Sequence, residues 1–201
     1  MEIISKEGKS EEEVLTEILE ENNLKKEDIV YNTKVTKGKL FKSSVVTVDV
    51  IKKEDLNEEV KDYLKEVISN LGLDVKFEVK KNEEYYVIKM YSDNNPILIG
   101  KNGNTLRALE ELCKAYVKNK YGIYYKISLD VENYRSKKEK SLERLAIRLA
   151  KEVKNTKENI EMDNMTSYER RIVHNALTNF KGVKTESEGV EPNRHVVIKP
   201  E

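Results

Sequence analysis

The chain has 201 residues, 38% of them hydrophobic and 37% charged, and its 37 basic side chains balance 37 acidic ones. This length predicts one or two ordinary domains or three small ones. The sequence has no apolar run near 18 residues and no signal-peptide pattern at its start, so we expect no membrane insertion and a cytoplasmic location. A single cysteine, Cys113, excludes a disulfide framework and a zinc site.

The neutral total conceals a difference between the two halves of the chain. Residues 1–91 carry 16 basic and 21 acidic side chains, whereas residues 92–201 carry 21 basic and 16 acidic ones. For a protein that binds an anionic polymer, the charge of the binding half matters more than that of the whole chain. The second half is therefore the better candidate for nucleic-acid binding.

Residues 1–51 predict a small β-α-β-β unit. Ser10 and Glu13 have the spacing of a capping box at the start of its helix. Strands with alternating apolar residues are predicted over 2–6, 29–35 and 40–51. About fifty residues bury little apolar surface, so we expect this unit to pack on a partner or on a second copy.

Residues 55–131 predict a second unit with the element order αββααβ. Its predicted elements are a helix over 57–70, strands over 73–79 and 85–91, a helical turn at Pro96, a helix over 105–117 and a strand over 123–131. Pro96 follows an asparagine, which is typical of a first helical position behind a cap.

Ile99-Gly100-Lys101-Asn102-Gly103 lies between the two last helices of this unit. A glycine has no Cβ to hold a phosphate off, and the start of the following helix favours negative charge. A Gly-x-x-Gly loop between two helices is how a KH module grips about four nucleotides. The tetrapeptide is common by chance in a chain with eight glycines, but the surrounding order resembles the bacterial, type II KH fold.

In this loop we expect Gly100 and Gly103 to donate backbone N–H groups to phosphate, with Asn102 between them. Lys101 and Arg107 would supply positive charge. The flanking Ile97 and Ile99 have two readings: they pack against splayed bases, or they belong to the core.

Residues 132–201 predict a third unit. Helices over 135–154 and from Thr166 onward precede strands over 183–187 and 195–198. The first helix carries a basic stripe that is either a nucleic-acid contact or a solvated face. Its residues are Lys137, Lys140, Arg144, Arg148 and Lys151.

Arg170 and His174 are four residues apart on the second helix and therefore share a face. We expect Arg170 to offer a donor fork to phosphate and His174 a hydrogen bond and a stacking face. The alternative for His174 is a half-buried histidine with satisfied ring nitrogens. Arg171 and Asn175 lie one step round the helix and are either contacts or solvated.

The text MTSYERRIVHNAL around this pair closely resembles the R-three-H domain, a small module that binds single-stranded nucleic acid. The later segment EPNRHVVIKP, which contains Arg194, fits the same module. The whole chain resembles the Jag family, also called SpoIIIJ-associated or KhpB proteins. Where that family has a Lys-Gly-Phe-Leu-Gly-like turn near the N-terminus, this chain has KGKLFKSS.

The resemblance implies an α+β fold of three units: a β-α-β-β unit over 1–51, a KH domain over 55–131 and an R-three-H domain over 132–201. It further implies a cytoplasmic bacterial RNA-binding protein linked to cell elongation and division. We also expect a homodimer or a complex with a small single-KH protein.

We therefore expect a binder of single-stranded RNA with no catalytic residue, metal or cofactor. Single strands are favoured because their unstacked bases expose their edges, and no recognition helix for duplex DNA is visible. The first alternative is a protein-interaction adaptor with little affinity for RNA. The remote alternative is a hydrolase built on His174 and His195, although metal-ligand spacing, a nucleophile elbow and a Walker loop are all missing from the sequence.

Overall fold

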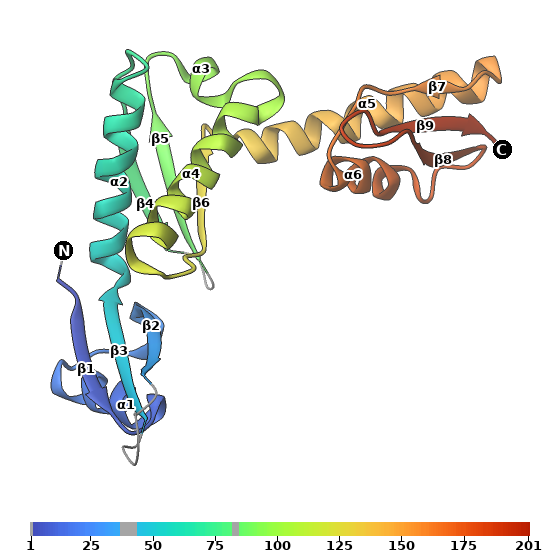
Figure 1. Cartoon of the computed structure of the whole chain (residues 1–201). Coiled ribbons are helices and arrows are strands. Elements are labelled where there is room, and N and C mark those ends of the chain that lie inside the picture. The colour runs from blue at the N-terminus through green and yellow to red at the C-terminus, as the bar shows by residue number, and fades with distance from the viewer. Residues whose placement is uncertain (1, 37–43, 82–84) are drawn as a thin grey trace. The chain divides into compact units, whose positions relative to one another are not determined.

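The computed structural model describes residues 2–36, 44–81 and 85–201. It contains two compact units, Met1–Glu132 and Asn133–Glu201, each taken by itself below (Figure 1). The first unit holds the N-terminal sheet and the KH-like elements, and the second holds the remaining helices and strands. Among the described residues, no helix combines the length and the apolar character needed to span a membrane.

The N-terminal part of the first unit is a three-stranded antiparallel sheet covered by one helix. Its elements are β1 (Ile4–Gly8), α1 (Glu11–Glu21), η1 (Lys26–Asp28), β2 (Ile29–Thr36) and β3 (Val45–Lys52), with the sheet order β1-β3-β2. Helix α1 buries Val14 and Ile18 against Val48 and Val50 of the central strand. Residues 37–43, which include most of the KGKLFKSS segment and the start of the strand predicted over 40–51, lie outside the described residues.

The KH-like part confirms the predicted order αββααβ. Its elements are α2 (Lys53–Ser69), β4 (Lys76–Lys81), β5 (Tyr86–Tyr91), α3 (Asn95–Ile99), η2 (Lys101–Gly103), α4 (Asn104–Tyr121) and β6 (Ile127–Val131). The sheet order is β4-β5-β6, with β4 antiparallel and β6 parallel to β5. Figure 1 shows α3 and α4 joined by the glycine-containing loop at the edge of this part.

Helix α2 begins at Lys53, earlier than the predicted residue 57, and directly follows the end of β3 at Lys52. Glu54 and Asp55 lie in its first turn, where carboxylates interact favourably with the helix dipole. The N-terminal sheet is therefore joined to the KH-like part without a loop between them.

The second unit packs two helices against a three-stranded antiparallel sheet. Its elements are α5 (Tyr134–Thr156), β7 (Ile160–Glu161), α6 (Ser167–Leu177), β8 (Val183–Glu188) and β9 (His195–Pro200), with the sheet order β7-β9-β8. The apolar side chains that meet in its core include Ala146, Ala150, Val153, Val173, Val196 and Ile198. The sequence does not predict strand β7, because two residues are too few to show an alternating pattern.

Capping interactions fix the start of α6. The Thr166 side chain accepts a hydrogen bond from Glu169 N at 3.4 Å, and the Glu169 carboxylate accepts one from Thr166 N at 2.8 Å. Lys138 of α5 lies 2.5 Å from the same carboxylate. This reciprocal pair satisfies N–H groups that the first helical turn leaves unpaired.

We predict that Thr166→Ala lowers the free energy of unfolding by about 1 kcal/mol, the usual cost of removing a threonine cap. Thr166→Ser is the matched control, because it keeps the accepting hydroxyl and should stay near the wild-type value. Urea unfolding followed by circular dichroism measures both. Equal stabilities for the alanine and serine variants would show that the cap contributes nothing.

Candidate nucleic-acid interface

The loop between α3 and α4 turns sharply at Gly100, whose φ of 70° and ψ of 177° are essentially restricted to glycine. Its N–H donates to Pro96 O at 2.8 Å and closes α3. A Cβ at this position would lie 2.1 Å from Thr105 Oγ1 and 2.9 Å from Thr105 N. The backbone of Gly100 therefore packs directly against the start of α4.

The next residues continue in the left-handed region, with φ of 57° at Asn102 and 80° at Gly103. Gly103 is buried, and its N–H donates to Gly100 O at 3.2 Å. Both glycine N–H groups are thus bonded within the protein. The expectation that they are free to donate to phosphate is wrong for this conformation. The glycines instead shape the loop.

The charged residues of the loop face solvent, as expected. Lys101, Asn102 and Arg107 are all exposed; the first two precede α4, and Arg107 lies in its first turn. Ile97 beside them is 47% exposed, whereas Ile99 is half-buried. Of the two readings of these isoleucines, surface contact fits Ile97.

Asn95 has a different role from the expected cap. The N-cap position of α3 is Asn94, which makes no side-chain capping bond. Asn95 Oδ1 accepts from Ser92 N at 2.9 Å, and its Nδ2 donates to Glu132 Oε1 at 2.7 Å. Asn95 thereby ties the start of α3 to the residue that follows β6.

In the second unit, Arg170 is buried, with 7% of its surface exposed. Its Nη1 donates to Met165 O at 2.7 Å and to Glu191 Oε1 at 3.0 Å. The expected solvent-facing donor fork is therefore not what the structure shows. Arg170 connects the segment before α6 to the loop between β8 and β9, a role that the sequence spacing did not reveal.

His174 is half-buried on the same helix, and hydroxyls of β8 contact both of its ring nitrogens. Nδ1 lies 2.7 Å from Thr185 Oγ1 and Nε2 lies 2.9 Å from Ser187 Oγ. Burial, and then the nearby positive charge of Arg170, lower the pKa of His174 below its ordinary value of 6.5. The satisfied-histidine reading is the one that the structure supports, and it leaves neither nitrogen for a phosphate.

The exposed face of α6 carries other groups. Tyr168, Arg171 and Asn175 are all exposed, and their spacing of three and four residues places them on one face. Tyr168 is 61% exposed and was not singled out in the sequence, although an exposed aromatic next to a basic residue is the signal that would have found it. Arg194 is also exposed.

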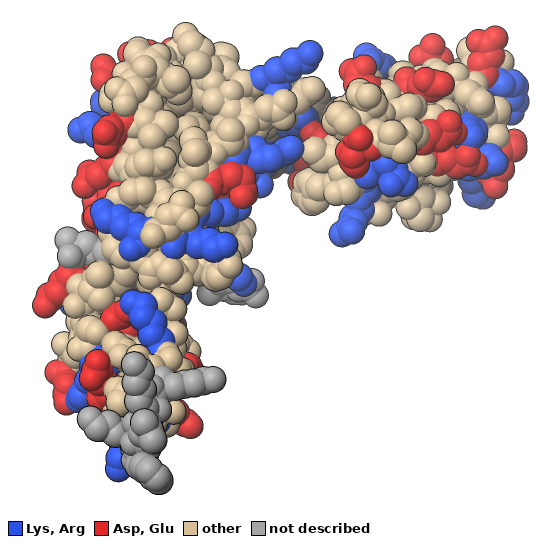
Figure 2. All heavy atoms as spheres, viewed as in Figure 1, with Lys and Arg blue, Asp and Glu red and all other residues tan. Residues whose placement is uncertain are grey.

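The expected basic stripe of α5 is exposed, and acidic residues lie elsewhere on the same helix. Arg144 donates from Nε to Lys140 O at 3.1 Å, and Glu139 and Glu143 lie on the same helix. Figure 2 shows basic and acidic side chains interspersed over the visible face of this unit. Both interpretations of the stripe therefore stay open: Lys137, Arg144 and Arg148 are candidate nucleic-acid contacts, or they form part of a solvated face.

Comparisons with known proteins agree with this organisation. A family model described as KhpA/KhpB, KH domain, matches residues 57–129, and one described as R-three-H domain matches residues 140–200. The chain is 34% identical to the RNA-binding protein KhpB of Clostridium symbiosum, over 98% of this chain and 91% of that protein. It is 32% identical to the RNA-binding protein KhpB of Bacillus subtilis, over 95% of each.

The environment of His174 predicts a pH effect on stability. Because its pKa is lower in the folded protein than the ordinary 6.5, the unfolded chain takes up this proton first as the pH falls. The contribution of neutral His174 to stability is complete above the ordinary pKa. The free energy of unfolding should therefore decrease as the pH drops through about 6.5.

Urea unfolding of the wild type and of His174→Gln between about pH 7.5 and 5.5 measures this contribution. The wild type should lose more stability than the variant over this range. Parallel pH dependences would show that His174 titrates alike in the folded and unfolded states.

Proposed function

Since the chain belongs to the KhpB family of RNA-binding proteins, we propose that it binds single-stranded RNA and catalyses no reaction. The observation that carries this proposal is the loop at Gly100–Gly103. The two glycines allow the tight turn that leaves Lys101 exposed, and Arg107 is exposed in the first turn of the helix that follows. This combination suits an extended, unpaired strand whose phosphates pass close to the protein backbone.

The second unit supplies a separate contact surface in this proposal. Its RNA-contacting groups are the exposed Tyr168, Arg171 and Asn175 of α6. Arg194, which is exposed in the loop between β8 and β9, is a further one. Tyrosine offers a base a stacking partner, and arginine offers phosphate a planar donor fork. Arg170 and His174 act behind this surface by holding the β8–β9 loop and β8 against α6.

The adaptor alternative concerns the N-terminal part, whose core is small. We propose that the chain forms a homodimer or pairs with a small single-KH protein, and that it acts in the cytoplasm in control of cell elongation and division.

The hydrolase alternative is disfavoured by His174, since hydroxyls rather than a carboxylate contact its ring nitrogens. Among the described residues, no group of His, Cys, Asp and Glu side chains is arranged to hold a metal ion.

Reversing the charge of the loop tests the RNA site. We predict that Lys101→Glu weakens binding of a short single-stranded RNA about 10- to 100-fold, because a charge-assisted contact worth about 1.5–3 kcal/mol is replaced by repulsion. Fluorescence anisotropy with a labelled oligonucleotide measures the affinity. Lys101 is exposed, so the melting temperature should not change.

Lys65→Glu is the matched control, because Lys65 is an exposed lysine of the same unit on α2. It should bind RNA nearly as well as the wild type. An equal loss in both variants would indicate a bulk charge effect, and no loss in a folded Lys101→Glu protein would remove the loop from the binding site. A wild type without affinity for RNA at low salt would favour the adaptor.

A further inference from the structure

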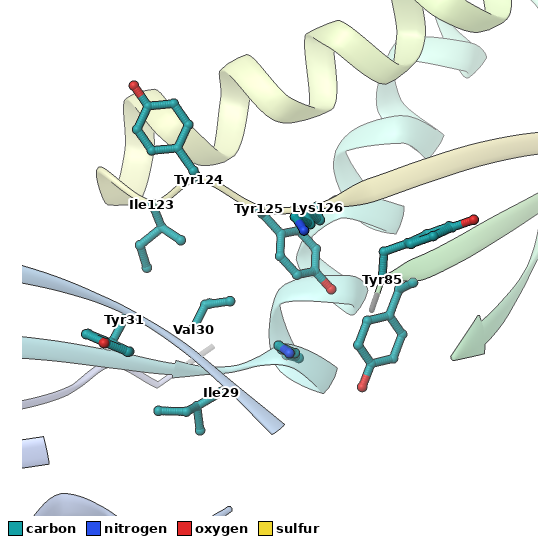
Figure 3. A pocket seen from close by; sticks show the side chains of 10 residues that line it. Ile29, Val30, Tyr31, Tyr85, Ile123, Tyr124, Tyr125 and Lys126 are labelled. Carbon is teal, nitrogen blue, oxygen red and sulfur yellow. The ribbon is translucent and has the colours of Figure 1, made fainter. Parts of the chain in front are cut away.

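A cavity of about 300 Å³ lies within the first unit, where the N-terminal sheet meets the KH-like part (Figure 3). Strand β2 forms one wall. The segment Ile123–Lys126, which joins α4 to β6, forms the opposite wall, and Tyr85 and Tyr86 at the start of β5 close one end. None of these residues belongs to the loop proposed above as the RNA site.

Direct contacts join the N-terminal part to the KH-like part beside the cavity. Lys81 Nζ lies 2.8 Å from Asp28 Oδ1, and Lys53 Nζ donates to Glu27 O at 2.7 Å. The packing is also close at Gly122, where a Cβ would lie 2.8 Å from the Asn32 amide nitrogen. The cavity is therefore built by specific contacts between the two parts of the unit.

The lining of this cavity is aromatic and basic. Five of the chain's eleven tyrosines line it, together with Lys53 and Lys126, and no carboxylate is among the described residues of the lining. The chain as a whole carries as many acidic as basic side chains, so this selection departs from its average. Aromatic faces beside lysines suit a ligand with a flat ring and a negative charge.

The tyrosines divide into two groups. Tyr125 is buried, and its hydroxyl donates to Asn57 Oδ1 at 2.6 Å. This bond fixes the position of the Tyr125 ring in the cavity lining. Tyr124 and Tyr85 are 81% and 40% exposed, so their rings are accessible to a ligand at the rim of the cavity, where Figure 3 shows the Tyr124 ring pointing away from Tyr125. Lys118 Nζ lies 4.8 Å from the centre of the Tyr124 ring, which adds a positive charge at the rim.

We propose that this cavity binds one nucleotide of the RNA strand, with its base against Tyr124 or Tyr85 and its phosphate near Lys126 and Lys118. A volume of about 300 Å³ is at the small end for ligand sites and suits a single nucleotide. The inference rests on the proposed RNA binding. It extends that function to a second site of stated chemistry in the same unit.

Helix α4 relates the two sites. It begins at the glycine loop and ends at Tyr121, immediately before the cavity wall. Its 18 residues span about 27 Å, which corresponds to about eight nucleotides at 3.4 Å per stacked nucleotide. A strand of about ten nucleotides therefore reaches from the loop to the cavity even when its bases stay stacked. A strand of four, all of them gripped by the loop, leaves no nucleotide for the cavity.

The first test uses a mononucleotide, so that it does not depend on the loop. The full chain labelled with 3-fluorotyrosine is titrated with adenosine or uridine monophosphate to about 10 mM, a range suited to weak single-nucleotide binding. The fluorine signals of Tyr85 and Tyr124, assigned by Tyr→Phe variants, should shift in both the wild type and Lys101→Glu. Tyr91, 42% exposed on β5 and outside the cavity, is the matched reference and should not shift.

The second test asks whether the RNA strand itself supplies the nucleotide. Of Tyr124→Ala and Tyr85→Ala, the variant that removes the stacking ring should weaken a ten-nucleotide RNA about 5- to 100-fold, the effect of losing one stacked base, and leave a four-nucleotide RNA unchanged. Tyr91→Ala should change neither affinity. Because Tyr124 is highly exposed, the melting temperature of its variant should match that of the wild type.

The outcomes separate this inference from the function on which it rests. Shifts with the mononucleotide but no effect of either Tyr124→Ala or Tyr85→Ala on the ten-nucleotide RNA would support a nucleotide site and overturn its occupation by the strand. Shifts in a chain that binds no RNA would overturn the proposed function and keep the site. Absence of shifts at Tyr85 and Tyr124, or equal shifts at Tyr91, would overturn the inference.

Discussion

The backbone conformation of Gly100 is the constraint on which the candidate interface depends. Its positive φ allows α3 to end and α4 to begin within a few residues, and the lack of a Cβ lets Thr105 pack against it. The hydrogen bond from Gly103 N–H to Gly100 O then closes the loop on itself. The loop therefore has a defined turn in which Lys101 is exposed, and in the proposed function its affinity for phosphate comes from this charge.

Buried polar contacts have a similar organising role in the second unit. Arg170 and His174 point to function in the sequence, yet in the structure they bond to Glu191, Thr185 and Ser187 within the protein. A buried cation that bonds to two segments fixes their relative position, and removing it would leave its acceptors unpaired. The residues that define this motif therefore support the surface, and their exposed neighbours on α6 are the groups that we propose as ligand contacts.

Much of the fold was predictable from the sequence because it depends on local signals. Alternation in β5, the capping box at Thr166 and the glycine loop each identified an element whose existence the structure confirms. The start of α2 and the two-residue strand β7 were not predictable, since their limits depend on tertiary packing and not on periodicity. The bonds of Arg170 and the cavity under Tyr124 join segments distant in the chain, and spacing along one helix or strand gives no information about such contacts.

The central claim is that a chain of zero net charge binds RNA through local positive charge. The dependence of the RNA dissociation constant on salt concentration tests it most directly. If about three to five phosphates are neutralised, the logarithm of the association constant should fall with the logarithm of the salt concentration at a slope of roughly −2 to −3.5. A slope near zero between low and physiological salt would contradict the account, because the exposed lysines and arginines would then be only a solvated surface.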